Sequence, residues 1–288
     1  SRRLSRRRPL MASQTLALAS QTLGAGDIPG ALIHCTLTHG GVLKGLANAL
    51  PSHHWLAPDL PNHGRSPDWP AGAPGMQKAS AEAIATLFGP TPRDVIGHSF
   101  GATVALRLAV LFPEKVRSLT LIEPVLGAIA RIDSPEVAAA HETEATQMLA
   151  EIHAGRYAEA AQLFTRDWGL GRPWDSIPEE ARTRMAAQMP FVAASQAEIF
   201  EDSPGLLQSG ALEALRIPTL VLEGAETAKR HPVMRVICQG LVRRIPKASH
   251  SLVDGAGHMA PLTHPDAVAT LIRHYLPDFD TQLSAAAR

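Results

Sequence analysis

The chain lacks the features that mark secreted and membrane proteins. Only two of its 288 residues are cysteines, Cys35 and Cys238, and they lie far apart in the sequence. Two such residues do not make a disulfide framework, and this fits a reducing compartment. No apolar run reaches the roughly eighteen residues that a membrane-spanning helix needs; the longest candidate, 102–112, contains Arg107. The sequence therefore predicts a cytoplasmic protein without a membrane partner.

The chain also lacks an excess of charge of either sign. Lys and Arg together number 27, as do Asp and Glu, so no nucleic-acid or membrane-surface partner is indicated. Five arginines cluster in the first eight residues, but no apolar stretch of signal-peptide length follows them. We expect residues 1–10 to be a disordered leader, or a remnant ahead of a true start at Met11. A basic arm for an anionic partner is the alternative.

The most informative pattern present is GHSFG at 97–101, which has the Gly-x-Ser-x-Gly form of a nucleophile elbow. Residues 93–96 read as a short strand and residues 102–112 as a helix. A serine on such a sharp turn, here Ser99, has a strained backbone, and the residues two positions away on either side must be small, as both glycines are. The turn also brings the first N–H groups of the helix beside the hydroxyl, where an oxyanion would form.

Apolar runs alternate with helical patterns along most of the chain. Strands are expected at 31–37, 54–59, 93–96, 116–122, 218–222 and 251–254, and helices at 80–88, 102–112 and 265–276. This alternation favours an α/β fold with a mainly parallel sheet and helices on both faces. We assign that core to residues 11–126 and 209–288.

Residues 127–208 break this alternation. They contain no convincing strand, and helices are expected at 135–155, 157–166, 178–189 and 191–200. An insertion of this length between two core strands is typical of a helical cap. Its large apolar side chains either line a pocket or pack the cap on itself: Phe164, Trp168, Trp174, Met185, Met189, Phe191 and Phe200.

A serine nucleophile needs a base, and the base needs an acid to orient it. Among thirteen histidines, His258 has the best position, because it follows the last expected strand in a glycine-rich loop and precedes the last helix. Such a loop lies at the carboxyl edge of a parallel sheet, where it reaches back to Ser99. We therefore predict His258 as the general base.

The motifs and their order resemble the α/β-hydrolase superfamily across residues 15–277. The motifs that carry the resemblance are THGG at 38–41, APDLPNHGRS at 57–66, GHSFG at 97–101, IPTLVL at 217–222 and GHM at 257–259. The resemblance implies an eight-stranded, mainly parallel sheet with a cap inserted into it. Serine at the elbow, where some members have aspartate, argues against haloalkane dehalogenase or epoxide hydrolase chemistry.

The resemblance also implies the two donors of the oxyanion hole. In the superfamily the residue after the His-Gly pair donates one N–H, which by position is that of Gly41, and the residue after the nucleophile, Phe100, donates the other. The chain departs from the superfamily at Asn62, where glycine is usual. It departs again in the short segment between Gly41 and Trp55.

The acid is the largest departure from the superfamily. Members usually carry Asp three residues after the glycine that ends the strand following the cap, and here Thr227 takes that place. Glu226 stands one position earlier. Glu123 ends the strand after the elbow helix, an edge from which some members supply the acid. We favour Glu123 and keep Glu226 as the alternative.

These residues predict an enzyme that hydrolyses a carboxylic ester, thioester or lactone through an acyl-serine. The expected partner is a small-molecule acyl substrate with a short or medium acyl group or a small aromatic one, and no metal or organic cofactor is implied. Hydrolysis of a carbon–carbon bond in a diketone and perhydrolysis are alternatives on the same scaffold. The rival from another class is a non-catalytic ligand receptor, because the usual acid is displaced.

Overall fold

The computed structural model of the protein describes residues 16–70, 73–203, 205–276 and 278–280. The leader expected at residues 1–10 lies outside this part of the chain. Within it, no helix has both the length and the apolar character needed to cross a membrane.

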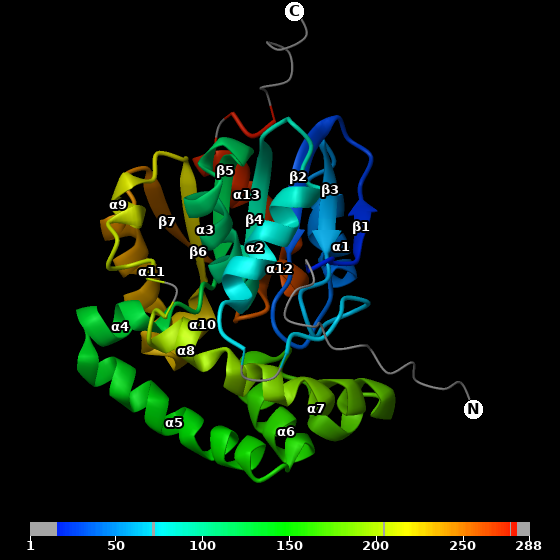
Figure 1. Cartoon of the computed structure of the whole chain (residues 1–288), viewed down its shortest axis with the longest axis vertical. Coiled ribbons are helices and arrows are strands. Elements are labelled where there is room, and N and C mark those ends of the chain that lie inside the picture. The colour runs from blue at the N-terminus through cyan, green and yellow to red at the C-terminus, as the bar shows by residue number, and fades with distance from the viewer. Residues whose placement is uncertain (1–15, 71–72, 204, 277, 281–288) are drawn as a thin grey trace, which may run out of the picture.

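A seven-stranded sheet forms the centre of the described chain, in the order β1-β3-β2-β4-β5-β6-β7 (Figure 1). Every neighbouring pair is parallel except β1 and β3, which pair antiparallel at one edge. The sheet is therefore mainly parallel, as predicted, and the described residues supply seven strands where eight were expected. The strands are β1 (Ser20–Leu23), β2 (Ile28–Ile33), β3 (His53–Pro58), β4 (Arg93–His98), β5 (Val116–Ile122), β6 (Thr219–Gly224) and β7 (Ala248–Val253).

The core helices connect the strands or follow them, and several pack on the two faces of the sheet. They are η1 (Gly40–Leu43), α1 (Lys44–Ala49), α2 (Met76–Leu87), α3 (Phe100–Leu111), η2 (Pro113–Lys115), α9 (Ala211–Ala214), α10 (Ala225–Arg230), α11 (Pro232–Arg244), α12 (Ala260–Thr263) and α13 (Pro265–Tyr275). Side chains alternate between the faces along each strand. Ile33 and Val95 therefore pack with α2, α3 and α11, whereas Leu32 and Ile96 pack with α1 and α13.

The helices between Gly127 and Phe200, named the cap, follow β5 and lie across the edge of the sheet that carries Ser99 (Figure 1). Its elements are α4 (Gly127–Asp133), α5 (Pro135–His153), α6 (Tyr157–Trp168), η3 (Trp174–Ser176), α7 (Glu179–Ala194) and α8 (Gln196–Phe200). The break expected at Pro190 falls later, at Ser195, and α7 continues through the proline. Phe191, the residue after Pro190, packs its ring against Phe100 of the core at a centroid distance of 5.1 Å, so tertiary packing holds this part of the helix in place.

The strand expected at 31–37 begins earlier and ends at Ile33. Side chains then replace the sheet as hydrogen-bond partners. Nε2 of His34 accepts from the N–H of Leu60 at 2.9 Å, and the hydroxyl of Thr38 donates to the carbonyl of Cys35 at 2.7 Å. The chain therefore turns away from the sheet directly after β2.

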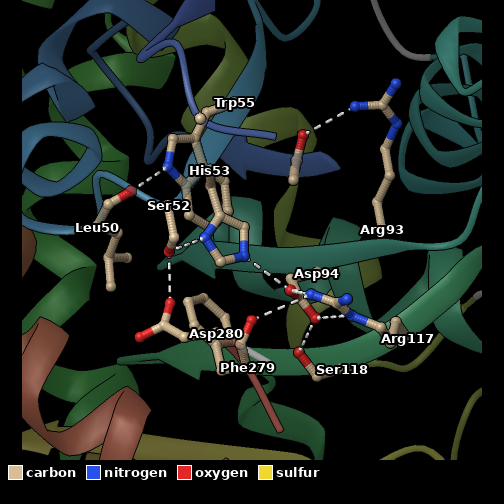
Figure 2. A network of polar contacts seen from close by, with 12 residues as sticks. Leu50, Ser52, His53, Trp55, Arg93, Asp94, Arg117, Ser118, Phe279 and Asp280 are labelled. Carbon is tan, nitrogen blue, oxygen red and sulfur yellow. Dashed lines mark hydrogen bonds and ion pairs between the residues drawn. The ribbon is translucent and has the colours of Figure 1, made fainter. Parts of the chain in front are cut away.

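A buried polar network lies at the opposite, amino edge of the sheet (Figure 2). Nε2 of His53 lies 2.8 Å from Oδ2 of Asp94. Arg117 and Ser118 donate to the same carboxylate. Arg117 also donates to the carbonyl of Phe279 at 3.3 Å, so the network ties the last described residues to the strands.

Candidate active site

Ser99 lies on the tight turn between β4 and α3, with φ +56° and ψ −121°. This backbone conformation is strained for a residue with a side chain. A Cβ atom on Gly97 would lie 2.4 Å from the carbonyl oxygen of Gly101, and one on Gly101 would lie 2.3 Å from that of His34. Only glycine fits at either position, so the strained elbow expected from the sequence is present.

The structure brings Ser99, His258 and Glu123 together. Nε2 of His258 lies 3.0 Å from Oγ of Ser99, and its Nδ1 lies 2.9 Å from Oε2 of Glu123. All three side chains are buried. Ser99 and His258 nevertheless line a cavity, so the hydroxyl and the imidazole are open to a bound molecule.

The Glu123 carboxylate is held by the backbone of the next strand. Oε1 of Glu123 accepts a hydrogen bond from the N–H of Gly224, and its own N–H donates to the carbonyl of Leu222 at 2.8 Å. Glu123 has φ +50°, an uncommon conformation for a residue other than glycine. Because both ends of the residue are fixed, the carboxylate is held in position to orient the ring of His258.

His258 is also held from its backbone. Its carbonyl lies 2.8 Å from Nε2 of His98, which is fully buried beside the elbow. Burial, and then the nearby His258, lower the pKa of His98 to about 3. His98 is therefore neutral at neutral pH, and its Nε2–H donates to the His258 carbonyl.

The alternative acid, Glu226, points elsewhere. Its carboxylate accepts from Nζ of Lys229 at 2.7 Å, and this hydrogen bond lowers the pKa of Glu226 below its ordinary value. Among the described residues no hydrogen bond joins Glu226 to His258. Thr227, at the usual acid position, is buried with no hydrogen-bond partner for its hydroxyl. Of the two candidate acids, the structure places Glu123 at His258.

The structure does not bring Gly41 to Ser99. The N–H of Gly41 donates to Nδ1 of His39 at 3.1 Å, and Gly41 does not line the cavity at the serine. That cavity is lined instead by Thr36, the third residue after β2. The sequence prediction extended the strand to Leu37. It therefore placed the loop after the strand, and the oxyanion donor in that loop, too far along the chain, at Gly41. Phe100 is the first residue of α3, so its N–H has no partner within the helix.

Asn62, where glycine is usual in the superfamily, adopts a backbone conformation that favours glycine. It has φ +67°, in the left-handed region that asparagine adopts more readily than other residues with side chains. Its Oδ1 accepts from the N–H of Trp69 at 3.1 Å, and its carbonyl accepts from Nε2 of Gln188 in the cap at 3.2 Å. The residue therefore connects the core loop to α7.

The two larger cavities between the cap and the core have volumes of about 100 Å³ and about 600 Å³, beside a third of about 30 Å³. Of the two larger, the smaller contains Ser99 and His258. Four of the seven large apolar cap residues singled out from the sequence line one or both cavities: Phe164, Trp168, Met185 and Phe200. The other three, Trp174, Met189 and Phe191, pack within the protein. The cap therefore both covers the serine and provides an apolar lining.

One group of possible metal ligands occurs in the described part of the chain: Glu223, Cys238 and His250, whose ligand atoms lie within 4.8 Å of one another. The Glu223 carboxylate already pairs with Nε of Arg235 at 2.7 Å and Nε2 of His250 at 3.1 Å. Burial raises the pKa of the Cys238 thiol well above its ordinary value. The ion pair between the buried Glu223 and the partly exposed Arg235 accounts for this group.

The fold and this constellation are those of a hydrolase, and comparison identifies the family. The profile of the alpha/beta hydrolase family matches residues 32–271. The chain belongs to this family.

Named relatives and solved structures agree with that assignment. The chain is 28% identical to lipase LipV of Mycobacterium tuberculosis over 251 aligned residues. The alignment covers 85% of this chain and 91% of LipV. It is 31% identical over 265 residues to a pimeloyl-[acyl-carrier protein] methyl ester esterase of Neisseria meningitidis, covering 87% of this chain and 78% of the relative. An alpha/beta hydrolase of Sphaerobacter thermophilus has the same fold, with a TM-score of 0.65 and 23% identity over 90% of this chain and 96% of that one.

Proposed function

We propose that this protein hydrolyses carboxylic esters through a covalent acyl-serine intermediate. The observation that carries the proposal is the continuous hydrogen-bonded chain from Oγ of Ser99 through both ring nitrogens of His258 to Oε2 of Glu123. Such an arrangement activates the serine, because the base accepts its proton and the carboxylate stabilises the imidazolium that forms. The relatives named as a lipase and as methyl ester esterases support ester hydrolysis as the reaction class.

The first half of the reaction forms the acyl-enzyme. Oγ of Ser99 attacks the ester carbonyl carbon while its proton passes to Nε2 of His258. The carbonyl oxygen takes up the negative charge and is stabilised by the N–H groups of Phe100, as expected from the sequence, and of Thr36, which takes the place of Gly41. When the intermediate collapses, the carbon–oxygen bond breaks and His258 returns the proton to the leaving alkoxide, so the alcohol departs.

Water completes the cycle. His258 takes a proton from the water, the resulting hydroxide attacks the acyl carbon, and the protonated His258 returns that proton to Oγ of Ser99 as the acid leaves. Glu123 stays ionised throughout and keeps Nδ1–H of the imidazole directed toward it. Thioesters and lactones undergo the same steps.

Labelling by a fluorophosphonate, which reacts with activated serines, tests the proposal. Peptide mass spectrometry is expected to find one adduct, on Ser99, and none in the Ser99→Ala variant. A folded protein that gives no adduct and hydrolyses no p-nitrophenyl acetate would contradict the proposal and favour a ligand receptor. No contact in the described residues specifically favours carbon–carbon bond hydrolysis or perhydrolysis.

A further inference from the structure

The two cavities at the cap are unequal and share a wall. The small one contains the Ser99 hydroxyl and the His258 ring. The large one extends between the loop at 36–42 and helices α6 and α7. Three residues line both cavities, namely Thr36, Phe164 and Trp168. An ester bound at Ser99 has two arms, the acyl chain and the alcohol, and each cavity can hold one of them.

The small cavity limits one arm to a few atoms. Its volume is about 100 Å³, whereas a cavity of about 150 Å³ holds benzene and one water molecule occupies about 30 Å³. About three or four non-hydrogen atoms therefore fit. Much of its wall is apolar, with side chains from the cap and from α11: Val192, Ile199, Phe200, Val233, Met234 and Ile237.

Trp168 is held in place where the two cavities meet. Its ring stacks on that of His231 with a centroid distance of 4.3 Å and an angle of 27° between planes. It also meets the ring of His258 edge to face at 4.9 Å, and on the cap side it meets His141 at 5.8 Å. Contacts on three sides leave the indole little freedom to swing aside when a longer group enters the small cavity.

The position of His258 decides which arm goes where. The leaving alkoxide must receive its proton from Nε2 of His258, so the alcohol has to lie on the side of that ring. His258 lines the small cavity and is not among the residues that line the large one. We propose that the site is specific for esters of a short alcohol with a long acyl chain, and that Trp168 sets the limit on the alcohol. The inference rests on the proposed function, and it replaces the preference for short or medium acyl groups expected from the cap's composition.

Two ester series test which arm is short. Methyl, ethyl, propyl, butyl and hexyl octanoate vary the alcohol, and methyl acetate to methyl dodecanoate vary the acyl chain. In a pH-stat, kcat/KM is expected to fall at least tenfold from the propyl to the hexyl ester. Along the acyl series it is expected to rise by up to about fourfold for each methylene that becomes buried. A fall along the acyl series with tolerance of long alcohols, or two flat series, overturns the inference.

Substitution of Trp168 tests its role against a matched cap tryptophan. Trp168→Ala is expected to raise the ratio of kcat/KM for hexyl over methyl octanoate at least tenfold. Trp174→Ala removes a ring that lines neither cavity, so the parental ratio is expected. Trp168→Leu keeps an apolar side chain and provides the same readout if the alanine variant does not fold. An unchanged ratio in both Trp168 variants contradicts the assigned role.

Fluorophosphonate labelling separates failure of this inference from failure of the proposed function. If Ser99 is labelled and esters are hydrolysed but the two series do not differ, only the inference is wrong. If no ester is hydrolysed and no label is found, the proposed function fails and the inference fails with it.

Discussion

In the described part of the molecule, two hydrogen-bonded groups of serine, histidine and carboxylate lie at opposite edges of the sheet. At the carboxyl edge Ser99, His258 and Glu123 are linked at 3.0 and 2.9 Å. At the amino edge Oγ of Ser52 lies 3.0 Å from Nδ1 of His53, whose Nε2 lies 2.8 Å from Asp94 (Figure 2). Distances alone do not distinguish the two.

The surroundings of the two groups distinguish them. The hydroxyl of Ser52 donates its hydrogen bond to the carboxylate of Asp280, so its hydrogen is not directed at His53. The ring of His53 is fully buried and contacts those of Trp55 and Phe279 at centroid distances of 4.5 and 4.3 Å, so a substrate does not reach it. Ser99, in contrast, stands on a strained turn at the start of a helix and opens into a cavity. Nucleophilic chemistry requires an accessible hydroxyl and oxyanion donors, in addition to a hydrogen-bonded triad. Of these two serines, only Ser99 opens into a cavity.

The two carboxylates, Asp94 and Glu123, also differ in their surroundings. Burial alone would raise the pKa of Asp94, but hydrogen bonds from His53, Arg117 and Ser118 outweigh it and hold the pKa below its ordinary value. The Asp94 carboxylate is shared among four donor atoms on two strands, β3 and β5. Among the described residues, the Glu123 carboxylate contacts one backbone N–H and one side chain, that of His258. The first arrangement suits stability and the second suits orientation of a base.

The largest expected effect is on kcat, and it distinguishes Ser99 from Ser52. Ser99→Ala removes the nucleophile and should lower kcat by roughly 10⁶-fold, whereas Ser52→Ala should leave kcat near the parental value. Hydrolysis of p-nitrophenyl acetate and butyrate, with thermal melting as a check on folding, measures both. Activity of Ser99→Ala within tenfold of the parent would rule out the acyl-serine.

The next effect concerns the acid of the active site. Glu123→Gln should lower kcat by roughly 10⁴-fold with little change in KM, because it loses the charge that stabilises the imidazolium. Glu226→Gln, whose parent carboxylate pairs with Lys229 at the surface, is the matched control and should stay near the parent. A large loss in Glu226→Gln with none in Glu123→Gln would reverse the assignment.

A smaller effect is expected at the amino edge, on stability. Asp94→Asn leaves the Arg117 guanidinium without its buried carboxylate and should lower the free energy of unfolding by about 3 kcal/mol. Urea unfolding measures this loss, and kcat of the folded variant should match the parent, because the network lies at the far edge from Ser99. A large fall in kcat of fully folded Asp94→Asn would show that the two edges are coupled.

The smallest effect is the contribution of a single buried histidine to the dependence of stability on pH between pH 7 and 5. Burial is the main cause that lowers the pKa of His34 to about 4 and of His98 to about 3. In the unfolded chain both take up protons near pH 6.5. The stability that each neutral ring provides is therefore complete above pH 6.5. It is lost as the pH falls toward 4 and 3, at up to about 1.4 kcal/mol per pH unit for each ring.

Urea unfolding at pH 7, 6 and 5 measures this slope. Other groups titrate in the same range, so the informative quantity is the difference between the parent and His98→Gln. The variant has one fewer group to protonate on unfolding and should lose less stability between pH 7 and 5. Parallel curves for the two proteins would contradict the contribution assigned to His98.

The sequence alone determined the features that depend on a few neighbouring residues. The two glycines around Ser99 predicted the elbow because their steric requirement acts within five residues, and the turn has the expected strain. The alternation of apolar runs and helical patterns predicted the parallel sheet and the inserted cap for the same reason. The place of His258 followed from strand order, since a loop after the last strand reaches the carboxyl edge.

Only the tertiary structure decided the relations between distant segments. Glu123 meets His258 across 135 residues of chain, and whether that carboxylate or Glu226 reaches the ring depends on which strands are neighbours. Thr36 replaces Gly41 at the serine because contacts with Leu60 and within the loop end β2 at Ile33. The two cavities, and the position of Trp168 between them, arise where the cap packs on the core. No local sequence pattern encodes such packing, because it is settled by side chains that come together only in the folded chain.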